Sequence, residues 1–173
     1  MNSGRFSGGY RDQDGRVHQL PDGVLPKWRP SAYALILRSE PERQILMVKP
    51  RCGSGVWELP GGGVNPLESV VEGLVRETLE ETGYHIRVPE KQRLLIGETS
   101  FFTESQGFCH TLLLIHRASL AFPEQDPQPN NTDPTDPHEI AEVAWQPLKS
   151  LNLRVCHMMF HDVLRELMNE TER

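Results

Sequence analysis

Apolar and polar positions alternate along the chain in a pattern that predicts both strands and helices. Short apolar runs bounded by polar turns are typical of strands; they cover residues 31–37, 44–50, 56–60, 94–103, 108–120 and 140–148. Apolar residues recur at helical spacing in two further segments, 66–82 and 154–168. This order of strands, helix, strands and helix predicts the α/β class, with helices packed on a mixed sheet.

The first predicted helix has start and stop signals in the sequence. Asn65 suits the N-cap, Pro66 the first helical position, and Gly83 the C-terminal stop. With 3.6 residues per turn, the apolar side chains share one face, which we expect to pack on the sheet. That face comprises Leu67, Val70, Val71, Leu74, Val75 and Thr78.

Three glutamates form a second band along the border of that apolar face. Glu77 lies one helical turn before Glu80 and Glu81, and no lysine separates them. Like charges at this spacing repel one another, and partial burial would raise their pKa values. A solvated helix face explains one such pair. Three acids at the edge of a core instead favour a hard divalent cation such as Mg²⁺, which takes oxygen ligands.

Consecutive glycines lie just before this helix. Gly61, Gly62 and Gly63 permit a tight turn from strand to helix, which is one explanation for them. They also allow a ligand to approach the backbone closely, and they leave carbonyl oxygens that can coordinate a cation. The stretch is not a P-loop, because no Gly-Lys-Ser/Thr follows it, and it lacks the spaced glycines of a dinucleotide-binding fold.

Two segments fall outside the regular pattern. Residues 1–27 are polar and rich in glycine, and we expect either a poorly ordered arm or a small hairpin that turns at Asp14-Gly15. The main domain is expected to cover residues 28–173. Residues 122–138 form a loop rich in Pro, Asp and Asn that is longer than most loops within compact domains.

Composition and charge narrow the range of partners. The chain is 37% hydrophobic and 24% charged, and its net charge is −6. That charge argues against binding a nucleic acid polymer, which needs a basic surface, but it leaves small phosphorylated ligands open. The cysteines are separated and form no CxxC pair, and no apolar leader or long apolar stretch is present. We therefore expect a cytoplasmic protein without a membrane partner.

The glycine–glutamate stretch resembles the signature of the Nudix family. The matching positions are Gly62, Glu68, Arg76, Glu77, Glu80, Glu81 and Gly83, at the spacing of the Nudix box and without a gap. Thr78 and Tyr84 replace bulky apolar residues of the pattern, and both substitutions concern packing. The order of the strands around the box extends the resemblance to about residues 28–168.

The resemblance implies a Nudix fold, an α/β/α sandwich whose box binds Mg²⁺ or Mn²⁺. Members hydrolyse a nucleoside diphosphate linked to some other group, X. The metal ligands implied by the match are Glu77, Glu80 and Glu81, with a backbone carbonyl of Gly61 or Gly62. The glycine turn, including Gly63, would receive the phosphates of the substrate. A homodimer is compatible with this reading.

Supporting and catalytic roles are also implied by the resemblance. Arg76 and Glu68 would support the metal ligands, and the helical wheel places both away from the metal band, which suits an orienting salt bridge. The general base is Glu77 or an acid delivered by a loop. Glu139 is preferred among the loop acids because it directly precedes the final predicted strand; the others are Glu124, Asp126, Asp133 and Asp136.

Further residues have two explanations each. Lys49 and Arg51 follow the second strand and are candidates for steering phosphates, but both are equally well explained as surface cations. His157 and His161 have the i, i+4 spacing that zinc sites use, but their apolar neighbours favour a structural role.

The leading functional prediction is a metal-dependent pyrophosphohydrolase. The alternatives are a Nudix-fold module that binds a nucleotide without cleaving it, and a structural protein with an acidic helix. All acids of the box are present, which favours catalysis. Residues 99–102, Thr-Ser-Phe-Phe, lack the proline and the tyrosine found after the box in two substrate classes of the family. The identity of X is therefore open.

Overall fold

The computed structural model describes residues 9–12, 15–51, 55–91, 95–104, 106–123 and 140–171. Its strands are β1 Tyr10–Arg11, β2 Val17–His18, β3 Lys27–Arg38, β4 Gln44–Pro50, β5 Gly61–Gly63, β6 Ile86–Arg87, β7 Leu95–Thr103, β8 Gly107–Leu120 and β9 Ile140–Pro147. The α-helices are α1 Val70–Thr82 and α2 His161–Thr171, and the short 3-10 turns are η1 Leu148–Ser150, η2 Leu153–Val155 and η3 Met158–Phe160.

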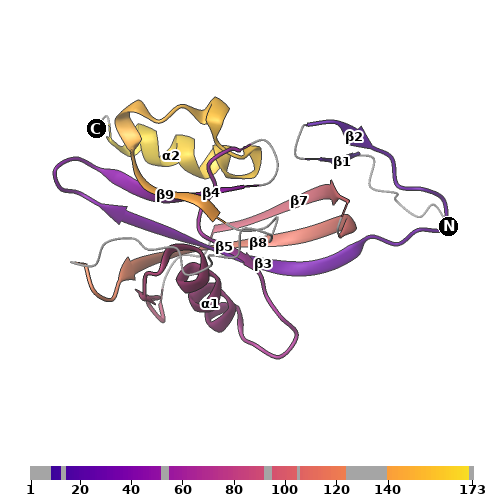
Figure 1. Cartoon of the computed structure of the whole chain (residues 1–173), viewed down its shortest axis with the longest axis horizontal. Helices are drawn as coiled ribbons and strands as arrows, with labels where there is room; N and C mark the ends of the chain where they lie inside the picture. Colours follow the sequence, from indigo (N-terminus) through magenta and orange to yellow (C-terminus); the bar gives the residue numbers. More distant parts are fainter. Residues whose placement is uncertain are drawn as a thin grey trace.

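One mixed sheet organises the molecule. Its strand order is β2-β1-β7-β8-β3-β4-β9, and β5 and β6 attach to β3 and β8. Strand β3 runs parallel to β8 and antiparallel to β4 and β5. Helix α1 lies below the sheet and α2 above it in the view of Figure 1. The predicted α/β/α arrangement is therefore confirmed.

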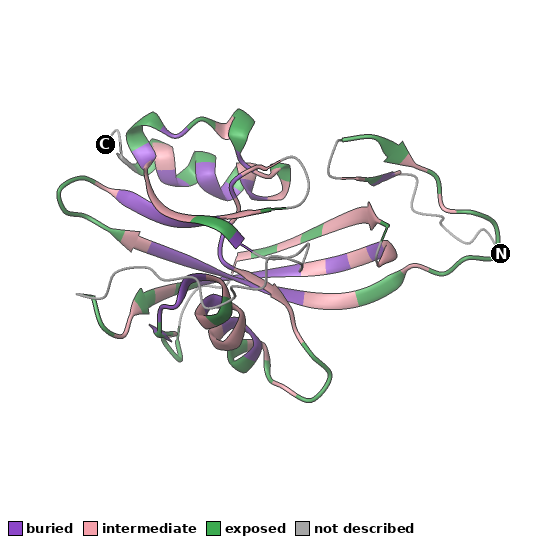
Figure 2. Cartoon of the chain, viewed as in Figure 1, coloured by how far each residue is buried: buried purple, intermediate pink, exposed green. Residues whose placement is uncertain are grey.

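Alternation along β3 divides the core into two layers. Tyr33 and Leu35 belong to the cluster that includes Leu164 of α2, whereas Ala34 and Ile36 belong to the cluster that includes Leu74 of α1. Successive side chains of a strand point to opposite faces, so one strand supplies both layers. The buried segments shown in Figure 2 accordingly run through the centre of the sheet and along the inner faces of the helices.

Helix α1 starts later than the sequence signals suggested. Its N-cap is Ser69, whose side chain accepts from the backbone N–H of Glu72 while Glu72 accepts from the N–H of Ser69. This reciprocal capping box replaces the expected start at Asn65 and Pro66. The predicted end is confirmed, because Gly83 forms the C-cap in the left-handed conformation at φ 73°.

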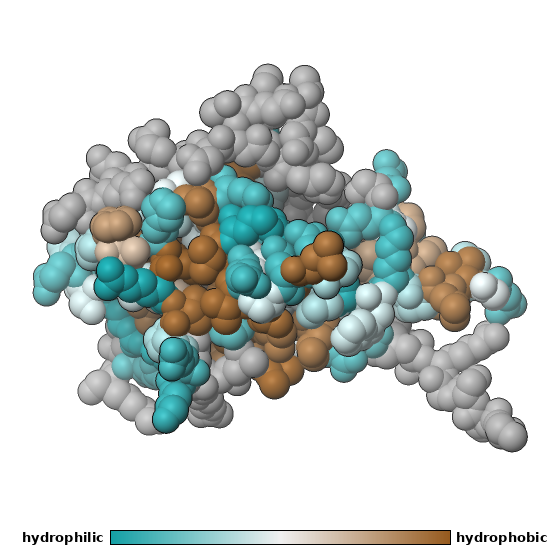
Figure 3. All heavy atoms as spheres, turned by 90° about the horizontal axis from the view of Figure 1, so that it is seen from below, coloured by the Kyte–Doolittle hydropathy of each residue, from teal (hydrophilic) through white to brown (hydrophobic). Residues whose placement is uncertain are grey.

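The later start changes which side chains the helix buries. Leu67, expected on the packed face, precedes the helix and is 101% exposed, and Val71 is 41% exposed. Leu74 and Thr78 are buried as expected. On the side of the molecule where α1 lies, apolar patches interrupt the polar surface (Figure 3).

Two other expected elements differ from the structure. Residues 56–60 form only isolated bridges, at Trp57 and Glu58, and the glycine run that follows is a short strand, β5, instead of a turn. In the C-terminal segment a helix was expected from residue 154, but 3-10 turns η2 and η3 come first and α2 begins at His161. The side chains of Asn152 and His157 each accept a backbone N–H at the start of these turns, which favours separate short turns over one helix.

The N-terminal segment contains the hairpin that the sequence allowed. Strands β1 and β2 pair antiparallel, and β1 also pairs with the end of β7, parallel, at Arg11 and Phe101. The division at residues 27 and 28 stays a prediction. No helix in the described ranges is long and apolar enough to cross a membrane.

Candidate active site

The strand β5 fixes the floor of the site. Gly61 is paired with Tyr33 and Gly62 with Ala32 of β3. Gly61 has a φ of 138°, and a Cβ there would lie 2.1 Å from the carbonyl oxygen of Ala32. Only glycine adopts this conformation readily at such close range. The glycines thus bring the backbone of β5 into direct contact with the central strand.

The same glycines meet the acidic band of α1. A Cβ on Gly62 would lie 2.9 Å from Cδ of Glu77, so the missing side chain makes room for that carboxylate. The backbone N–H of Gly61 donates to Oε2 of Glu81 at 2.8 Å. The structure therefore brings the predicted metal ligands Glu77 and Glu81 together with Gly61 and Gly62.

Burial perturbs these carboxylates unequally. Burial raises the pKa of Glu81 well above its usual value, although the hydrogen bond from Gly61 opposes the shift. Burial also raises the pKa of Glu77, against the opposing effect of Arg76. Glu80 lies further out, with 55% of its side chain exposed. Two of the three predicted ligands are thus held where a negative charge is costly.

Arg76 is the cation at the centre of this group. It binds Glu68 through two hydrogen bonds, Nη2 to Oε1 at 2.7 Å and Nε to Oε2 at 3.0 Å. Its Nη1 also lies 2.9 Å from Oε1 of Glu77 and 3.1 Å from Oε2 of Glu80. The orienting salt bridge expected from the helical wheel is present. In addition, the long side chain of Arg76 reaches the predicted metal ligands Glu77 and Glu80. A helical wheel does not show this contact, because it gives only the direction in which each side chain leaves the helix.

Glu68 is itself held in place. It accepts from the backbone N–H of Asn65 at 2.7 Å. The hydrogen bonds from Arg76 and Asn65 lower the pKa of Glu68 to about 2, so this carboxylate is ionised at neutral pH. Arg76 and Glu68 therefore form a fixed ion pair beside the glycine strand, and Arg76 Nη2 also reaches the carbonyl oxygen of Gly63 at 3.3 Å.

The carboxylates have the oxygen atoms that a hard divalent cation takes as ligands, but in this structure they are not arranged around a single point. Among the described residues, no group of three His, Cys, Asp or Glu side chains is arranged closely enough to hold a metal ion as it stands. Arg76 occupies the space between Glu77 and Glu80, and a backbone N–H occupies one oxygen of Glu81. The donor set is nevertheless all oxygen and includes partly buried acids, which suits Mg²⁺ or Mn²⁺.

A broad open cavity of about 1680 Å³ lies in front of these acids. Its walls come from the N-terminal hairpin, β5, the acidic edge of α1, β7 and the segment from Cys156 to Glu166. Of the predicted site residues, those lining it are Gly61, Gly62, Gly63, Arg76, Glu77, Glu80 and Glu81. A cavity of this size accommodates a nucleotide derivative.

Two predicted phosphate contacts lie elsewhere. Lys49 pairs with Glu142 at 3.4 Å, stands over the ring of Trp57, and is not among the described residues that line the cavity. Arg51 is exposed and is likewise outside that lining. Their role in binding stays a prediction. Glu139 and the other loop acids lie outside the described residues.

Among the charged residues that line the cavity but were not predicted from the sequence are Arg29 and Glu58. Arg29 of β3 has a buried Nε without a hydrogen-bond partner in the described structure, and a Cβ on Gly63 would lie 2.4 Å from its Cζ. Glu58 lies shortly before β5 in the chain, and burial raises its pKa to about 7. Neither belongs to a recognisable motif. Strand pairing across many residues places them beside the acids, and no local pattern shows this.

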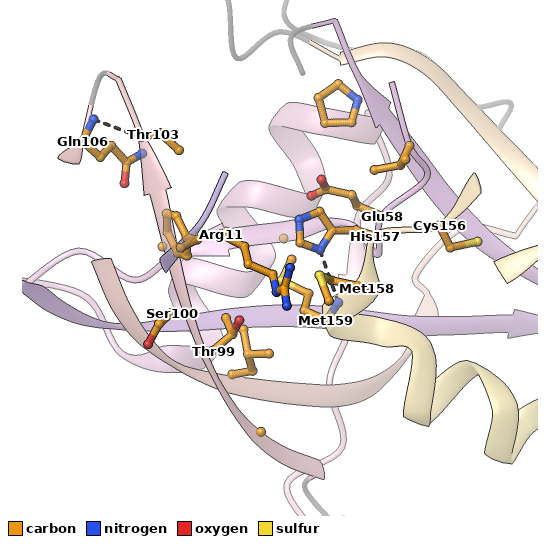
Figure 4. Close-up of a pocket in the computed structure, with 18 of the residues that line it drawn as sticks. Arg11, Glu58, Thr99, Ser100, Thr103, Gln106, Cys156, His157, Met158 and Met159 are labelled. Atoms are coloured by element: carbon orange, nitrogen blue, oxygen red, sulfur yellow. Dashed lines mark hydrogen bonds between the residues drawn. The ribbon is translucent and has the colours of Figure 1, made fainter. Parts of the chain in front are cut away.

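The histidines near the C-terminus make backbone contacts. Nδ1 of His157 accepts from the N–H of Met159 at 3.3 Å, and Nε2 of His161 lies 3.0 Å from the carbonyl oxygen of Cys156. These contacts agree with the structural role that was favoured. His157 also lines the cavity, where it lies near Glu58 (Figure 4), and burial lowers the pKa of His157.

Known proteins share the α/β/α sandwich of this chain. The family described as "NUDIX domain" matches residues 27–171. The chain belongs to the Nudix family. Its fold agrees with that of a MutT protein from Methanosarcina mazei Go1, with a TM-score of 0.59 and 23% identity over 87% of this chain and 100% of the other.

Relatives of this Nudix chain differ in their named substrates. The NAD-capped RNA hydrolase NudC of Stutzerimonas stutzeri (strain A1501) is 32% identical over 69% of this chain and 37% of that protein. The oxidized purine nucleoside triphosphate hydrolase of Mus musculus is 37% identical over 40% of this chain and 42% of that protein. The chain thus spans less than half of the length of these curated relatives.

Proposed function

We propose that this Nudix chain is a Mg²⁺- or Mn²⁺-dependent hydrolase that cleaves the pyrophosphate bond of a nucleoside diphosphate linked to a group X. The observation that carries the proposal is the contact of Glu77 and Glu81 with the glycine strand, on the floor of a cavity large enough for a nucleotide. Family membership supports the reaction class.

The metal would be held by Glu77, Glu80 and Glu81 with the carbonyl of Gly62. When bound, such an ion neutralises phosphate oxygens and lowers the pKa of a water molecule. Arg76 would give up its contacts with Glu77 and Glu80 while its two bonds to Glu68 keep it beside the site. In the metal-free protein Arg76 pairs with Glu77 and Glu80. With a metal bound, the two hydrogen bonds to Glu68 would keep Arg76 in place.

The chain's own groups supply proton transfer and substrate binding. A water oxygen bonds to phosphorus, the bond from phosphorus to the bridging oxygen breaks, and a carboxylate accepts the proton of the water. Glu77 is suited to that role because its pKa is raised by burial; Glu139 is the other candidate. Arg29 lines the cavity, its guanidinium lies next to Gly63, and this group is suited to a substrate phosphate.

Turnover of a substrate panel tests the proposal. The wild type, Glu80→Gln and Glu81→Gln are assayed in Mg²⁺ for release of phosphate or nucleoside monophosphate from nucleoside triphosphates, ADP-ribose and other nucleoside diphosphate derivatives. We expect loss of at least about 100-fold in kcat for both variants, as removal of a key electrostatic group typically causes. Glu90→Gln is the control because Glu90 is exposed and does not line the cavity.

Thermal melting separates the alternatives. A hydrolase and a non-catalytic sensor module are both stabilised by Mg²⁺ or by ligand, since ligands that bind only the folded state raise its stability. A structural protein with an acidic helix is not stabilised. Unchanged turnover in Glu80→Gln and Glu81→Gln would contradict the hydrolase mechanism. Binding of a panel member without any turnover would instead favour the sensor.

The partner expected is a small phosphorylated nucleotide-type substrate, and the identity of X is not fixed by the box. The names of two relatives point to different substrates, which agrees with this. The cytoplasmic location, the homodimer and the absence of nucleic acid polymers and membranes as partners stay predictions.

A further inference from the structure

The N-terminal hairpin forms one wall of the cavity although it precedes the matched Nudix region. Arg11, Asp12, Arg16 and His18 all line the cavity together with the acids of α1. The family match begins at residue 27, so these residues lie outside it. The hairpin therefore adds side chains to the site that the family signature does not account for.

Aromatic contacts dock the hairpin on the sheet. Tyr10 is 4% exposed and packs edge-on against Phe108, with ring centroids 5.1 Å apart. His18 stacks on Phe102 at 4.3 Å, and its Nε2 lies 2.7 Å from Oδ2 of Asp12. Aromatic pairs of this kind add to the stability gained by burial. Backbone pairing of β1 with β7 completes the attachment.

The docking of Tyr10 determines where the next side chain points. Successive residues of a strand face opposite sides, so burial of Tyr10 against Phe108 turns Arg11 the other way. In Figure 4 the side chain of Arg11 extends into the cavity, between Thr99 of β7 and the segment that carries His157 to Met159. The guanidinium donates to the carbonyl oxygen of Gly15 at 3.2 Å, which uses one of its five N–H donors.

We propose that Arg11 is a specificity-determining residue of the substrate site, and that its guanidinium binds a pair of hydrogen-bond acceptors on the substrate. This inference rests on the proposed hydrolase function of the same cavity. Guanidinium groups match planar pairs of acceptors, which are present both in a terminal phosphate and on the carbonyl-bearing edge of a base. The hairpin then contributes a substrate-binding residue, Arg11, and Tyr10 acts as the residue that positions it.

Nucleotide binding, measured separately from turnover, tests this role. The dissociation constants of non-hydrolysable analogues of GTP, ATP, UTP, CTP and ADP-ribose are measured in Mg²⁺ by calorimetry for the wild type, Arg11→Gln and Tyr10→Ala. We expect the dissociation constant to rise at least about tenfold in Arg11→Gln. Tyr10→Ala should reproduce the loss with the same pattern across the panel. Arg87→Gln is the matched control, because Arg87 is an exposed strand arginine that does not line the cavity.

The pattern across the panel identifies the acceptor. An equal loss for the four triphosphates with none for ADP-ribose indicates a terminal phosphate, whereas a loss greater for GTP, whose O6 and N7 are adjacent acceptors, than for ATP indicates a base edge. Turnover of the unmodified nucleotides separates the hydrolase proposal from the role of Arg11. If the wild type binds nucleotides but does not hydrolyse them, the hydrolase proposal fails while the role of Arg11 in binding can still be tested. Unchanged affinity in Arg11→Gln, or no nucleotide binding by the wild type, overturns the role of Arg11. Loss of melting temperature without loss of affinity would make Arg11 a structural residue of the hairpin.

Discussion

Replacement of Gly62 by alanine perturbs the carboxylate of Glu77 without disturbing the sheet. The new Cβ would lie 2.9 Å from Cδ of Glu77 and 3.0 and 3.1 Å from its two oxygens. These atoms form the end of a side chain, so we expect the carboxylate to move. Restoring ordinary contacts of about 3.5 Å requires a shift of roughly half an ångström.

The stability change from this substitution should be small. Gly62 has no left-handed φ, and alanine in place of glycine at a compatible position contributes about 0.4–1 kcal/mol of stability through the unfolded chain. Weakening the partly exposed contact between Glu77 and Arg76 costs about 1 kcal/mol at most. The net change is within about 1 kcal/mol, or about 2–4 °C in Tm for a chain of this size.

The effect on activity should be larger. Displacement of a reacting group by about 1 Å lowers a rate by about 100-fold. The smaller shift expected for Glu77 then lowers kcat by about tenfold. Gly62→Ala should therefore separate activity from stability.

Gly61→Ala is the contrasting variant. Its Cβ would lie 2.1 Å from the carbonyl oxygen of Ala32 and 2.7 Å from Cα of Tyr33, at a φ of 138°. Backbone atoms of the central strand cannot move aside, so we expect a loss of more than about 3 kcal/mol. Melting temperature should fall by more than about 6 °C.

Calorimetric melting and steady-state kinetics in Mg²⁺ decide the matter, with the best substrate of the panel. Gly107→Ala serves as the control for backbone strain alone, since Gly107 has a φ of 76°, a Cβ there meets no atom within 4 Å, and Gly107 does not line the cavity. A folded Gly62→Ala protein with kcat within twofold of the wild type would refute the placement of Glu77 at the reacting centre. Equal loss of stability in both variants would refute the distinction between side-chain and backbone contacts.

Two further predictions concern stability. Ser69→Ala removes the N-cap of α1 and should lower the free energy of unfolding by about 1 kcal/mol in urea titrations while leaving kcat unchanged, because the cap lies at the end of α1 remote from Glu81; a tenfold loss of kcat would contradict this. His157 has a lowered pKa in the folded state, so its contribution to stability is complete above about pH 6.5 and declines as the pH falls towards that lowered pKa. His157→Gln should therefore lose less stability than the wild type between about pH 7 and 5, measured by thermal melting, and equal slopes would show that His157 does not titrate there.

The strands and the acidic box were predictable because their signals are local. Apolar runs marked β4, β7, β8 and β9 almost to the residue, since each run is bounded by polar turns, whereas β3 starts four residues before the apolar run that predicts it. The start of α1 was predicted wrongly although a signal existed, because Ser69 and Glu72 have the spacing of a capping box. Asn65 and Pro66 offered a competing start, and no sequence rule alone decides between two adequate caps.

The rest of the site depends on contacts between distant parts of the chain. Gly61 to Gly63 form a strand because β3 offers a partner there, which a glycine run does not indicate by itself. Arg29 and Glu58 approach the acids through pairing of β3 and through the bridge of Glu58 with Val48. Arg11 enters the cavity only because Tyr10 packs on a strand about a hundred residues later in the chain.

The helical wheel predicts three glutamates that repel one another, but in the structure each of them has a partner that offsets part of its charge. Arg76 lies between Glu77 and Glu80, and a backbone N–H meets Glu81, so the protein itself compensates part of the negative charge. The pKa values of Glu77 and Glu81 nevertheless remain raised, chiefly because burial disfavours their charged forms. Arg76 supplies one positive charge, whereas a divalent ion supplies two. If the proposed ion binds, Arg76 would give up its contacts with Glu77 and Glu80 to it. The affinity for Mg²⁺, measured by calorimetric titration, should therefore be higher in Arg76→Lys than in the wild type, because a point charge loses the forked contacts that hold arginine in place; an equal or lower affinity would contradict this exchange.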